Sequence, residues 1–204
     1  WSSVTLSQRC SSSSVFLIVY RRFRRYLLNL VGVIGYRLFG FRYDISLERI
    51  LKDVGQEEEN LPPATLELLR SISSCWNNDT KLTLSGRILL REYYCDILRM
   101  RARIEKLARE VPEVLDVPIT RPLFIVGWPR VGSTFMHKLL ACDPSAKGPP
   151  LWQLVNPVPE NWEEGVAPAE SQIRDTQLAM DYYFDLEPQL YMLHEMNATN
   201  ADEC

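Results

Sequence analysis

The sequence contains no run of uncharged residues long enough to cross a bilayer, although its first 43 residues are rich in apolar side chains. Arginines interrupt that region, and its longest uncharged stretch, Tyr26 to Tyr36, has 11 residues. A membrane-spanning helix needs about 20 residues, so a transmembrane segment is disfavoured. The arginines also lie inside the apolar region rather than ahead of it, which is unlike a signal peptide.

Acidic residues are missing from residues 1–43, which carry seven arginines. The other 16 basic residues and all 26 acidic residues fall in residues 44–204, which therefore have a net charge of −10. A basic arm is thus joined to an acidic body, and an acidic body is a poor non-specific binder of nucleic acid. We expect no nucleic-acid partner.

Cysteine spacing typical of a metal site is also absent. The five cysteines, at positions 10, 75, 95, 142 and 204, are scattered, and no pair forms a C-x-x-C motif. Reduced thiols in a cytoplasmic environment are the simplest interpretation, and no metal ion is expected. The chain of 204 residues is long enough for one domain with a core, or for one domain with appendages.

The N-terminal arm, residues 1–43, has two parts. Residues 1–14 are rich in serine and are predicted to be disordered. For residues 15–43 four interpretations stay open: a helix that packs on its own domain, a helix that lies on a membrane surface with its arginines at the headgroups, a membrane anchor, or an artefact of the gene model. The second would give a cytoplasmic protein peripheral contact with a membrane.

Residues 44–120 have the apolar periodicity of helices. We expect three, each bounded by a cap or a breaker: residues 47–54 between Ser46 and Gly55, a second from Pro62 or Pro63 to the Asn77–Asp79 break, and a third from Thr83 or Ser85 to about Val111. The third has a stripe of Ile88, Leu89, Ile97, Leu98, Ile104, Leu107 and Ala108. Its arginines and glutamates are expected to be solvated.

Residues 121–140 contain a pattern of strand, loop and helix. Leu123–Val126 predict a short buried strand, and a glycine-bounded loop runs from Gly127 to Gly132. Ser133 and Thr134 then open a helix with an apolar face of Phe135, Met136, Leu139 and Leu140. Free amides and the dipole at such a helix start favour an anion, so the loop predicts a phosphate-type ligand.

The rest of the chain is less regular. Asp143 and Pro144 predict a turn, and Leu151–Val155 could be a short strand or a buried helical turn. Pro168 begins a further helix to about Leu186, with Ile173, Met180 and Phe184 at helical spacing.

The loop differs from the Walker A pattern G-x-x-x-x-G-K-[ST] at one decisive position. Gly127, Gly132 and Thr134 match it, but Ser133 stands where the lysine would hold the β- and γ-phosphates. The cation is Arg130, two residues before the second glycine, where a guanidinium could bridge phosphate-ester oxygens. An ordinary nucleotide kinase is therefore disfavoured.

The segment PRVGSTF, residues 129–135, resembles the Pro-Lys/Arg-x-Gly-Thr/Ser-Thr loop of sulfotransferases. The wider stretch RPLFIVGWPRVGSTFMHKLLACDPSAKGPPLWQL is similar to the bacterial-type branch of that family, and the tail LHEMNATNADEC is similar to the family's later segment. The resemblance covers residues 44–204 and is specific over 121–156. It implies an α/β fold, with a P-loop-like parallel sheet between flanking helices.

The resemblance also implies a reaction and the residues for it. A sulfuryl group would move from 3′-phosphoadenylyl sulfate (PAPS), as co-substrate, to a hydroxyl or amine. The donor would be bound at Arg130, Val131, Gly132, Ser133, Thr134 and Phe135, with Arg130 at the 5′-phosphate and bridging oxygen. His194 and Glu203 are the two candidates for the general base, and Glu203 is narrowly preferred.

Some features depart from the family. Trp128 replaces a small aliphatic residue, and Glu195 replaces the proline expected after His194. The arginine and serine expected at the 3′-phosphate would lie beyond Cys204. We therefore expect the chain to be truncated, its sheet to be incomplete, and residues 1–204 alone to be weakly active or inactive.

Two other functions stay open, a P-loop nucleotide kinase and a non-catalytic helical interaction protein with a degenerate site. The acceptor and the oligomeric state are not predicted, although the basic apolar arm weakly favours a lipid-like hydroxyl.

Overall fold

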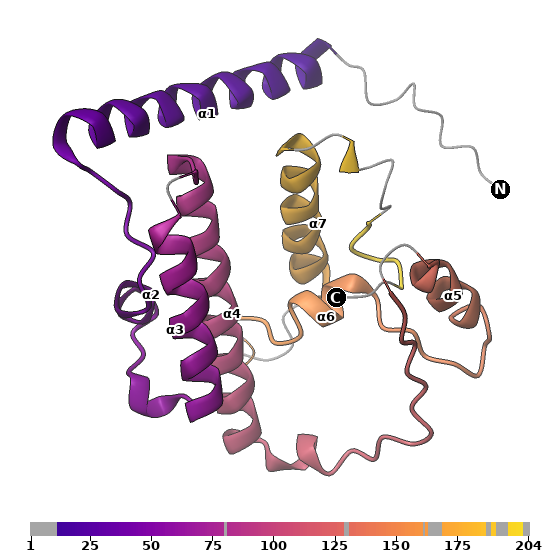
Figure 1. Ribbon diagram of the computed structural model, residues 1–204. Coiled ribbons are helices and arrows are strands. Elements are labelled where there is room, and N and C mark those ends of the chain that lie inside the picture. The colour runs from indigo at the N-terminus through magenta and orange to yellow at the C-terminus, as the bar shows by residue number, and fades with distance from the viewer. Residues whose placement is uncertain are drawn as a thin grey trace. The chain divides into compact units, whose positions relative to one another are not determined.

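The structure is a computed structural model that describes residues 12–79, 81–128, 131–160, 162, 169–186, 189–190 and 196–201. Its secondary structure within these ranges is helical, apart from an isolated antiparallel bridge between Pro150 and Ala201. The chain divides into two compact units, residues 1–101 and residues 102–204. Figure 1 shows the helices in chain order, from α1 in indigo to α7 in yellow.

The first unit contains α1, α2, α3 and most of α4, with one short 3-10 turn. Their bounds are α1 Ser12–Phe39, α2 Leu47–Val54, η2 Glu58–Asn60, α3 Pro63–Asn78 and α4 Leu84–Glu110. The three helices expected between residues 44 and 120 are confirmed with ends within one or two residues. Ser12–Ser14 were expected to be disordered, but they begin α1, while residues 1–11 lie outside the described ranges.

The predicted caps of α2 are present. The Ser46 hydroxyl accepts a hydrogen bond from the Arg49 amide at 3.4 Å, and Gly55 ends the helix with a left-handed φ of 65°. At α4 the two expected starts are resolved in favour of Thr83, whose hydroxyl accepts from the Gly86 amide at 3.2 Å. These ends form from local side-chain chemistry, which is why the sequence predicts them.

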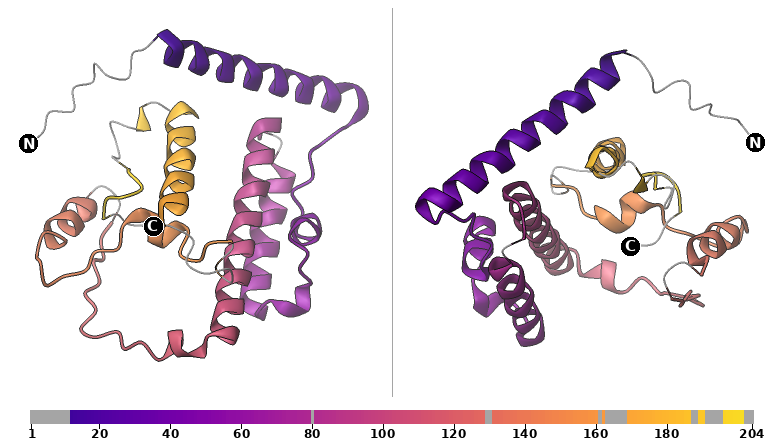
Figure 2. Two further views of the ribbon diagram at one scale, coloured as in Figure 1. Left: turned by 180° about the vertical axis from the view of Figure 1, so that it is seen from behind. Right: turned by 45° about the horizontal axis from the view of Figure 1, so that its top comes forward.

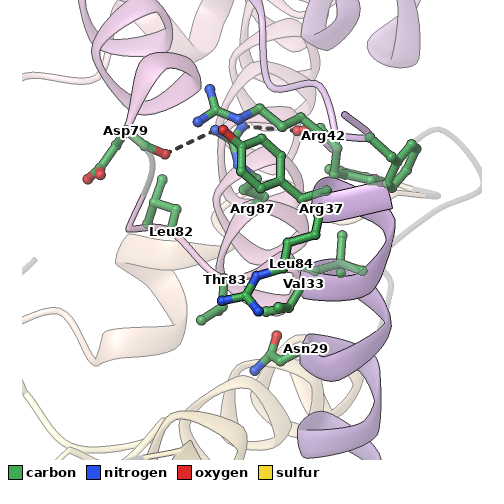
Figure 3. Close-up of a pocket in the computed structure, with 13 residues that line it drawn as sticks. Asn29, Val33, Arg37, Arg42, Asp79, Leu82, Thr83, Leu84 and Arg87 are labelled. Atoms are coloured by element: carbon green, nitrogen blue, oxygen red, sulfur yellow. Dashed lines mark hydrogen bonds between the residues drawn. The ribbon is translucent and has the colours of Figure 1, made fainter. Parts of the chain in front are cut away.

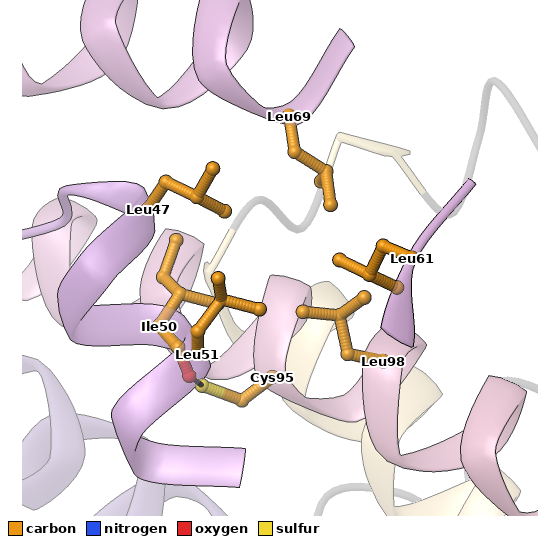
Figure 4. Close-up of a cluster of buried hydrophobic side chains, with 7 residues drawn as sticks. All are labelled: Leu47, Ile50, Leu51, Leu61, Leu69, Cys95 and Leu98. Atoms are coloured by element: carbon orange, nitrogen blue, oxygen red, sulfur yellow. Dashed lines mark hydrogen bonds between the residues drawn. The ribbon is translucent and has the colours of Figure 1, made fainter. Parts of the chain in front are cut away.

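A cluster of aliphatic side chains holds α2, α3 and α4 together. Figure 4 shows it as Leu47, Ile50, Leu51, Leu61, Leu69, Cys95 and Leu98. Each is at most 9% exposed. Fully burying one such side chain stabilises a fold by about 1.5–3 kcal/mol, so this cluster is the main source of stability that we identify in the first unit.

The buried face of α4 corrects the expectation that its arginines are solvated. Arg87 and Arg91 are 3% and 9% exposed, and they lie on one face of the helix with Cys95 and Leu98. Arg87 donates to the carbonyl oxygens of Asn77 at 2.6 Å and Asp79 at 3.2 Å, in the last turn and at the C-cap of α3. Unpaired carbonyls at a helix end need donors, and Arg87 supplies them.

Arg91 is held by a different set of partners. Its guanidinium pairs with the Asp53 carboxylate at 2.5 Å and lies 4.4 Å from the centre of the Tyr43 ring. It also donates to the Asp44 carbonyl oxygen at 3.2 Å. The two arginines therefore tie the segment before α2 to α4.

The second unit includes the rest of α4, the 3-10 turn η3 and the helices α5, α6 and α7. Their bounds are η3 Pro112–Leu115, α5 Ser133–Leu140, α6 Leu151–Val155 and α7 Ala169–Leu186. Its buried residues are Leu151, Val158, Gln172, Thr176, Met180 and Ala198. The Leu151–Val155 segment is thus a helical turn rather than a strand, and Leu151 is its buried residue.

The parallel sheet of the expected α/β fold is not found among the described residues, and the strand predicted at Leu123–Val126 is wrong for this structure. These four residues are irregular and between 38% and 93% exposed. A strand exists through hydrogen bonds to a neighbouring strand, and no described segment pairs with residues 123–126. Apolar character alone therefore does not make them a strand.

Candidate functional site

The start of α5 is built around a left-handed glycine. Gly132 has φ 90° and ψ 21°, and its carbonyl oxygen accepts the Met136 amide at 3.0 Å, the first turn of the helix. A residue with a Cβ adopts this conformation only with strain of about 1–2 kcal/mol. The glycine lets the chain turn directly into a helix whose first amides and dipole attract an anion.

Gly127 has a different role in the same loop. A Cβ at residue 127 would lie 2.8 Å from Cγ2 of Val131, which is closer than real contacts allow. The loop therefore folds back so that its first glycine faces Val131. Pro129 and Arg130, between them, lie outside the described residues.

The side chains around the loop divide by exposure. Ser133 and Thr134, the first two residues of α5, are half-buried, while Val131 and Phe135 are 62% and 70% exposed. Trp128 is 84% exposed, so it forms an open aromatic flank of the loop. The five described residues predicted to bind the donor, from Val131 to Phe135, are thus brought together at one helix start.

The apolar face predicted for α5 is not covered in this structure. Phe135, Met136 and Leu139 are 45–70% exposed, and α5 contains no buried residue. In a strand-loop-helix unit this face packs against a sheet, but no sheet is found among the described residues to cover it.

The two candidate bases, His194 and Glu203, lie outside the described residues. The nearby tail is anchored, because the amides of Leu151 and Trp152 donate to the carbonyl oxygens of Asn200 and Ala198, both at 3.0 Å. Ala198 is fully buried, and its amide donates to the Gln177 side chain at 3.1 Å. Residues 196–201 are therefore packed against α6 and α7 (Figure 2).

Gly148 is a contact point that the sequence analysis missed. A Cβ there would lie 2.9 Å from Cβ of Ala141, just after α5, and 3.3 Å from Cβ of Ala201. The eight residues of α5 span about 12 Å, so Ala201 meets the end of α5 that is distant from Gly132. The glycine before Pro149 and Pro150 was the available signal for this close approach.

His137 lies on the side of α5 that contacts Gly148. Its Nε2 would be 3.4 Å from a Cβ at that glycine, and the imidazole is half-buried. Packing beside the chain after α5 is a structural role for His137.

A separate cavity of about 130 Å³ belongs to the first unit. Figure 3 shows residues that line it, among them Asn29, Arg37, Arg42 and Thr83. Arg42 lies 5.2 Å from the centre of the Tyr36 ring, and Arg87 is held by backbone carbonyls. All the residues that line this cavity belong to the first unit.

A glycine-bounded loop at a helix start, with two hydroxyls, is the kind of local arrangement that can bind an anion. The model of the sulfotransferase family matches residues 122–204, from the loop to the tail. A search of curated proteins found no match.

The structure is similar to a crystal structure of sulfotransferase STF1 from Mycobacterium tuberculosis H37Rv, with a TM-score of 0.59 and 25% sequence identity. That match covers 80% of this chain and 46% of the mycobacterial chain, so this chain spans a little under half of the other's length. The two comparisons support the assignment of this chain to the sulfotransferase family, as its loop motif indicated.

Proposed function

We propose that this protein is a PAPS-dependent sulfotransferase that moves a sulfuryl group to a hydroxyl or amine acceptor. The observation that carries the proposal is the left-handed Gly132 at the start of α5, inside the segment that the sulfotransferase family model matches. A backbone that turns this sharply into a helix presents amides to an anion rather than filling a core.

The donor fits the residues of the loop. Gly132, Ser133 and Thr134 would hold the 5′-phosphosulfate through amides and hydroxyls, and the Arg130 guanidinium would contact the 5′-phosphate and the bridging oxygen. Val131 and Phe135 flank this position, and both are exposed. Each glycine restricts the loop in its own way, because a Cβ at Gly127 would lie 2.8 Å from Cγ2 of Val131 and a Cβ at Gly132 would strain its left-handed φ.

The proposed transfer is in-line. The acceptor oxygen or nitrogen attacks sulfur, the bond from sulfur to the bridging oxygen breaks, and adenosine 3′,5′-bisphosphate leaves with the bonding electrons. The acceptor's proton passes to Glu203 or to His194 as general base, which contributes roughly 10²–10⁴ in rate. Positioning at the loop and stabilisation of charge on the leaving phosphate supply the larger share.

Ligand binding tests the proposal directly. Adenosine 3′,5′-bisphosphate is expected to raise the melting temperature of the intact protein, and ATP with magnesium is expected to raise it less. The reverse order would favour the nucleotide-kinase alternative, and no response to either ligand would favour a non-catalytic interaction protein.

Arg130→Ala is the matched test of the loop. We expect loss of PAPS turnover with a melting temperature close to that of the wild type, because most substitutions outside a packed core or a buried polar network change stability little. Wild-type turnover by this variant would remove Arg130 from the site, and Lys138→Ala is a control for the loss of one positive charge on the neighbouring helix.

A further inference from the structure

Helix α1 presents a continuous apolar surface to solvent. Five of its residues are spaced three or four apart, which places them along one side of the helix. We call this set the α1 stripe: Phe23, Leu27, Leu30, Ile34 and Leu38, each between 42% and 68% exposed. Tyr26, Val31 and Val33 beside them are exposed as well.

The opposite side of α1 is the one that contacts the first unit. The Asn29 side chain accepts the Ser85 amide at 2.9 Å, at the start of α4. A Cβ at Gly32 would lie 2.6 Å from Cβ of Leu84, so only glycine permits this approach. Gly32 is nine residues after Phe23, which at about 100° per residue puts it across the helix from the α1 stripe.

The arm therefore packs on its own unit, as one of the sequence interpretations held, but through a polar and small side. The packing leaves the large apolar residues outside. Burying them by rotation of α1 would remove the Asn29 hydrogen bond and the Gly32 contact.

The charge of α1 indicates what the stripe fits. The helix carries five arginines and no acidic residue. Arg22 and Arg24 stand on either side of Phe23 in sequence, about 100° to each side of it around the helix. Arginine side chains at such positions can extend from an apolar layer to phosphates above it, and each adds attraction to an anionic surface.

We propose that α1 lies in the plane of an anionic membrane surface, with the α1 stripe at the acyl boundary and the flanking arginines at the lipid phosphates. No helix among the described residues is long and apolar enough to cross a membrane, so α1 would lie on the surface rather than span it. A second copy of the chain fits the stripe poorly, because it would bring five arginines from each α1 together without an acid on either helix.

This proposal does not depend on the proposed sulfotransferase activity. If both hold, the membrane is also a place to look for a lipid-like acceptor, since the enzyme would be concentrated there.

Vesicle sedimentation tests the proposal on the intact protein. It is expected to sediment with phosphatidylcholine vesicles that contain about 30% phosphatidylserine, and to stay in the supernatant with pure phosphatidylcholine. The double variant Leu27→Ser/Ile34→Ser is expected to lose at least about tenfold in vesicle affinity, and Arg22→Gln/Arg24→Gln is expected to lose affinity and salt sensitivity together.

Leu68→Ser is the matched control, because Leu68 is 59% exposed on α3 and should leave vesicle binding unchanged. Failure of the wild type to bind anionic vesicles would overturn the proposal, and so would undiminished binding by the stripe variant. A dimer in light scattering that Leu27→Ser/Ile34→Ser converts to a monomer, without vesicle binding, would show that a second copy covers the stripe.

Discussion

Replacing Gly132 by alanine is a sensitive test of the loop, because the substitution changes the backbone preference without a steric clash. Nothing lies within 4 Å of a Cβ built at Gly132, whose φ is 90°. The cost is then the left-handed conformation itself, about 1–2 kcal/mol for an L-residue. Unfolding assays measure the part of this cost that lowers stability, and binding assays measure the part that lowers ligand affinity.

Where the cost appears depends on how the loop responds. If the variant keeps the left-handed φ, the free and bound proteins are equally strained, and only the free energy of unfolding falls. If the unliganded loop relaxes, stability is retained and the ligand must restore the conformation, so affinity falls by about 5–30-fold. Gly132 and Val131 are exposed, so we expect the loop to relax and affinity to take most of the loss.

Calorimetric titration with adenosine 3′,5′-bisphosphate and urea unfolding measure the two parts. Gly55→Ala is the control, because Gly55 has φ 65°, equally open space and a position at the end of α2. It should cost stability alone. Gly132→Asn should recover part of the loss, since asparagine tolerates the left-handed region. The reasoning would be refuted if Gly132→Ala changed neither the free energy of unfolding nor the affinity for adenosine 3′,5′-bisphosphate. It would also be refuted if Gly132→Asn bound this ligand as weakly as Gly132→Ala.

Two further predictions concern the rest of the chain. Arg87→Leu is expected to lower the free energy of unfolding by about 3 kcal/mol or more in urea titrations, because it leaves the carbonyls of Asn77 and Asp79 without their donor. Burial also lowers the pKa of Arg87, but the guanidinium stays charged at neutral pH. A loss of under about 1 kcal/mol would contradict the proposed role of Arg87. Hydrogen bonds from the Ser145 amide and hydroxyl lower the pKa of Asp143. Because the folded pKa is the lower one, this stabilisation is present above the unfolded value near 3.9 and is lost as pH falls through the folded value. Asp143→Asn should therefore weaken the loss of unfolding free energy at acidic pH, and an identical loss in the variant would disprove the contribution.

The helices could be predicted from sequence because their ends are local. Ser46, Gly55 and Thr83 lie within four residues of the backbone groups that they cap or end, so a short window contains the whole interaction. The buried arginines could not be found in this way. Arg91 needs Asp53 and Tyr43, about 40 residues earlier, and without those partners an arginine on a long helix looks solvated.

The wrong prediction at Leu123–Val126 has the same cause. A run of aliphatic residues indicates a strand only if another strand pairs with it, and the sequence of one segment does not say which other segment does. The described residues contain no such partner, and the four side chains stay exposed.

The described ends of the loop belong with the local features, because their conformation does not depend on any paired strand among the described residues. Gly132 sets the turn through its own φ, and Gly127 fits against Val131 four residues away. The resemblance of residues 129–135 to a sulfotransferase loop is likewise a feature of a short stretch of sequence. The proposed base is different, because His194 and Glu203 are far from the loop in sequence, and their approach to it would depend on how the tail packs. Substitutions at the glycines should therefore weaken donor binding more than they lower the rate of transfer, whereas loss of the Ala198 and Asn200 contacts should lower the rate of transfer while donor affinity stays unchanged.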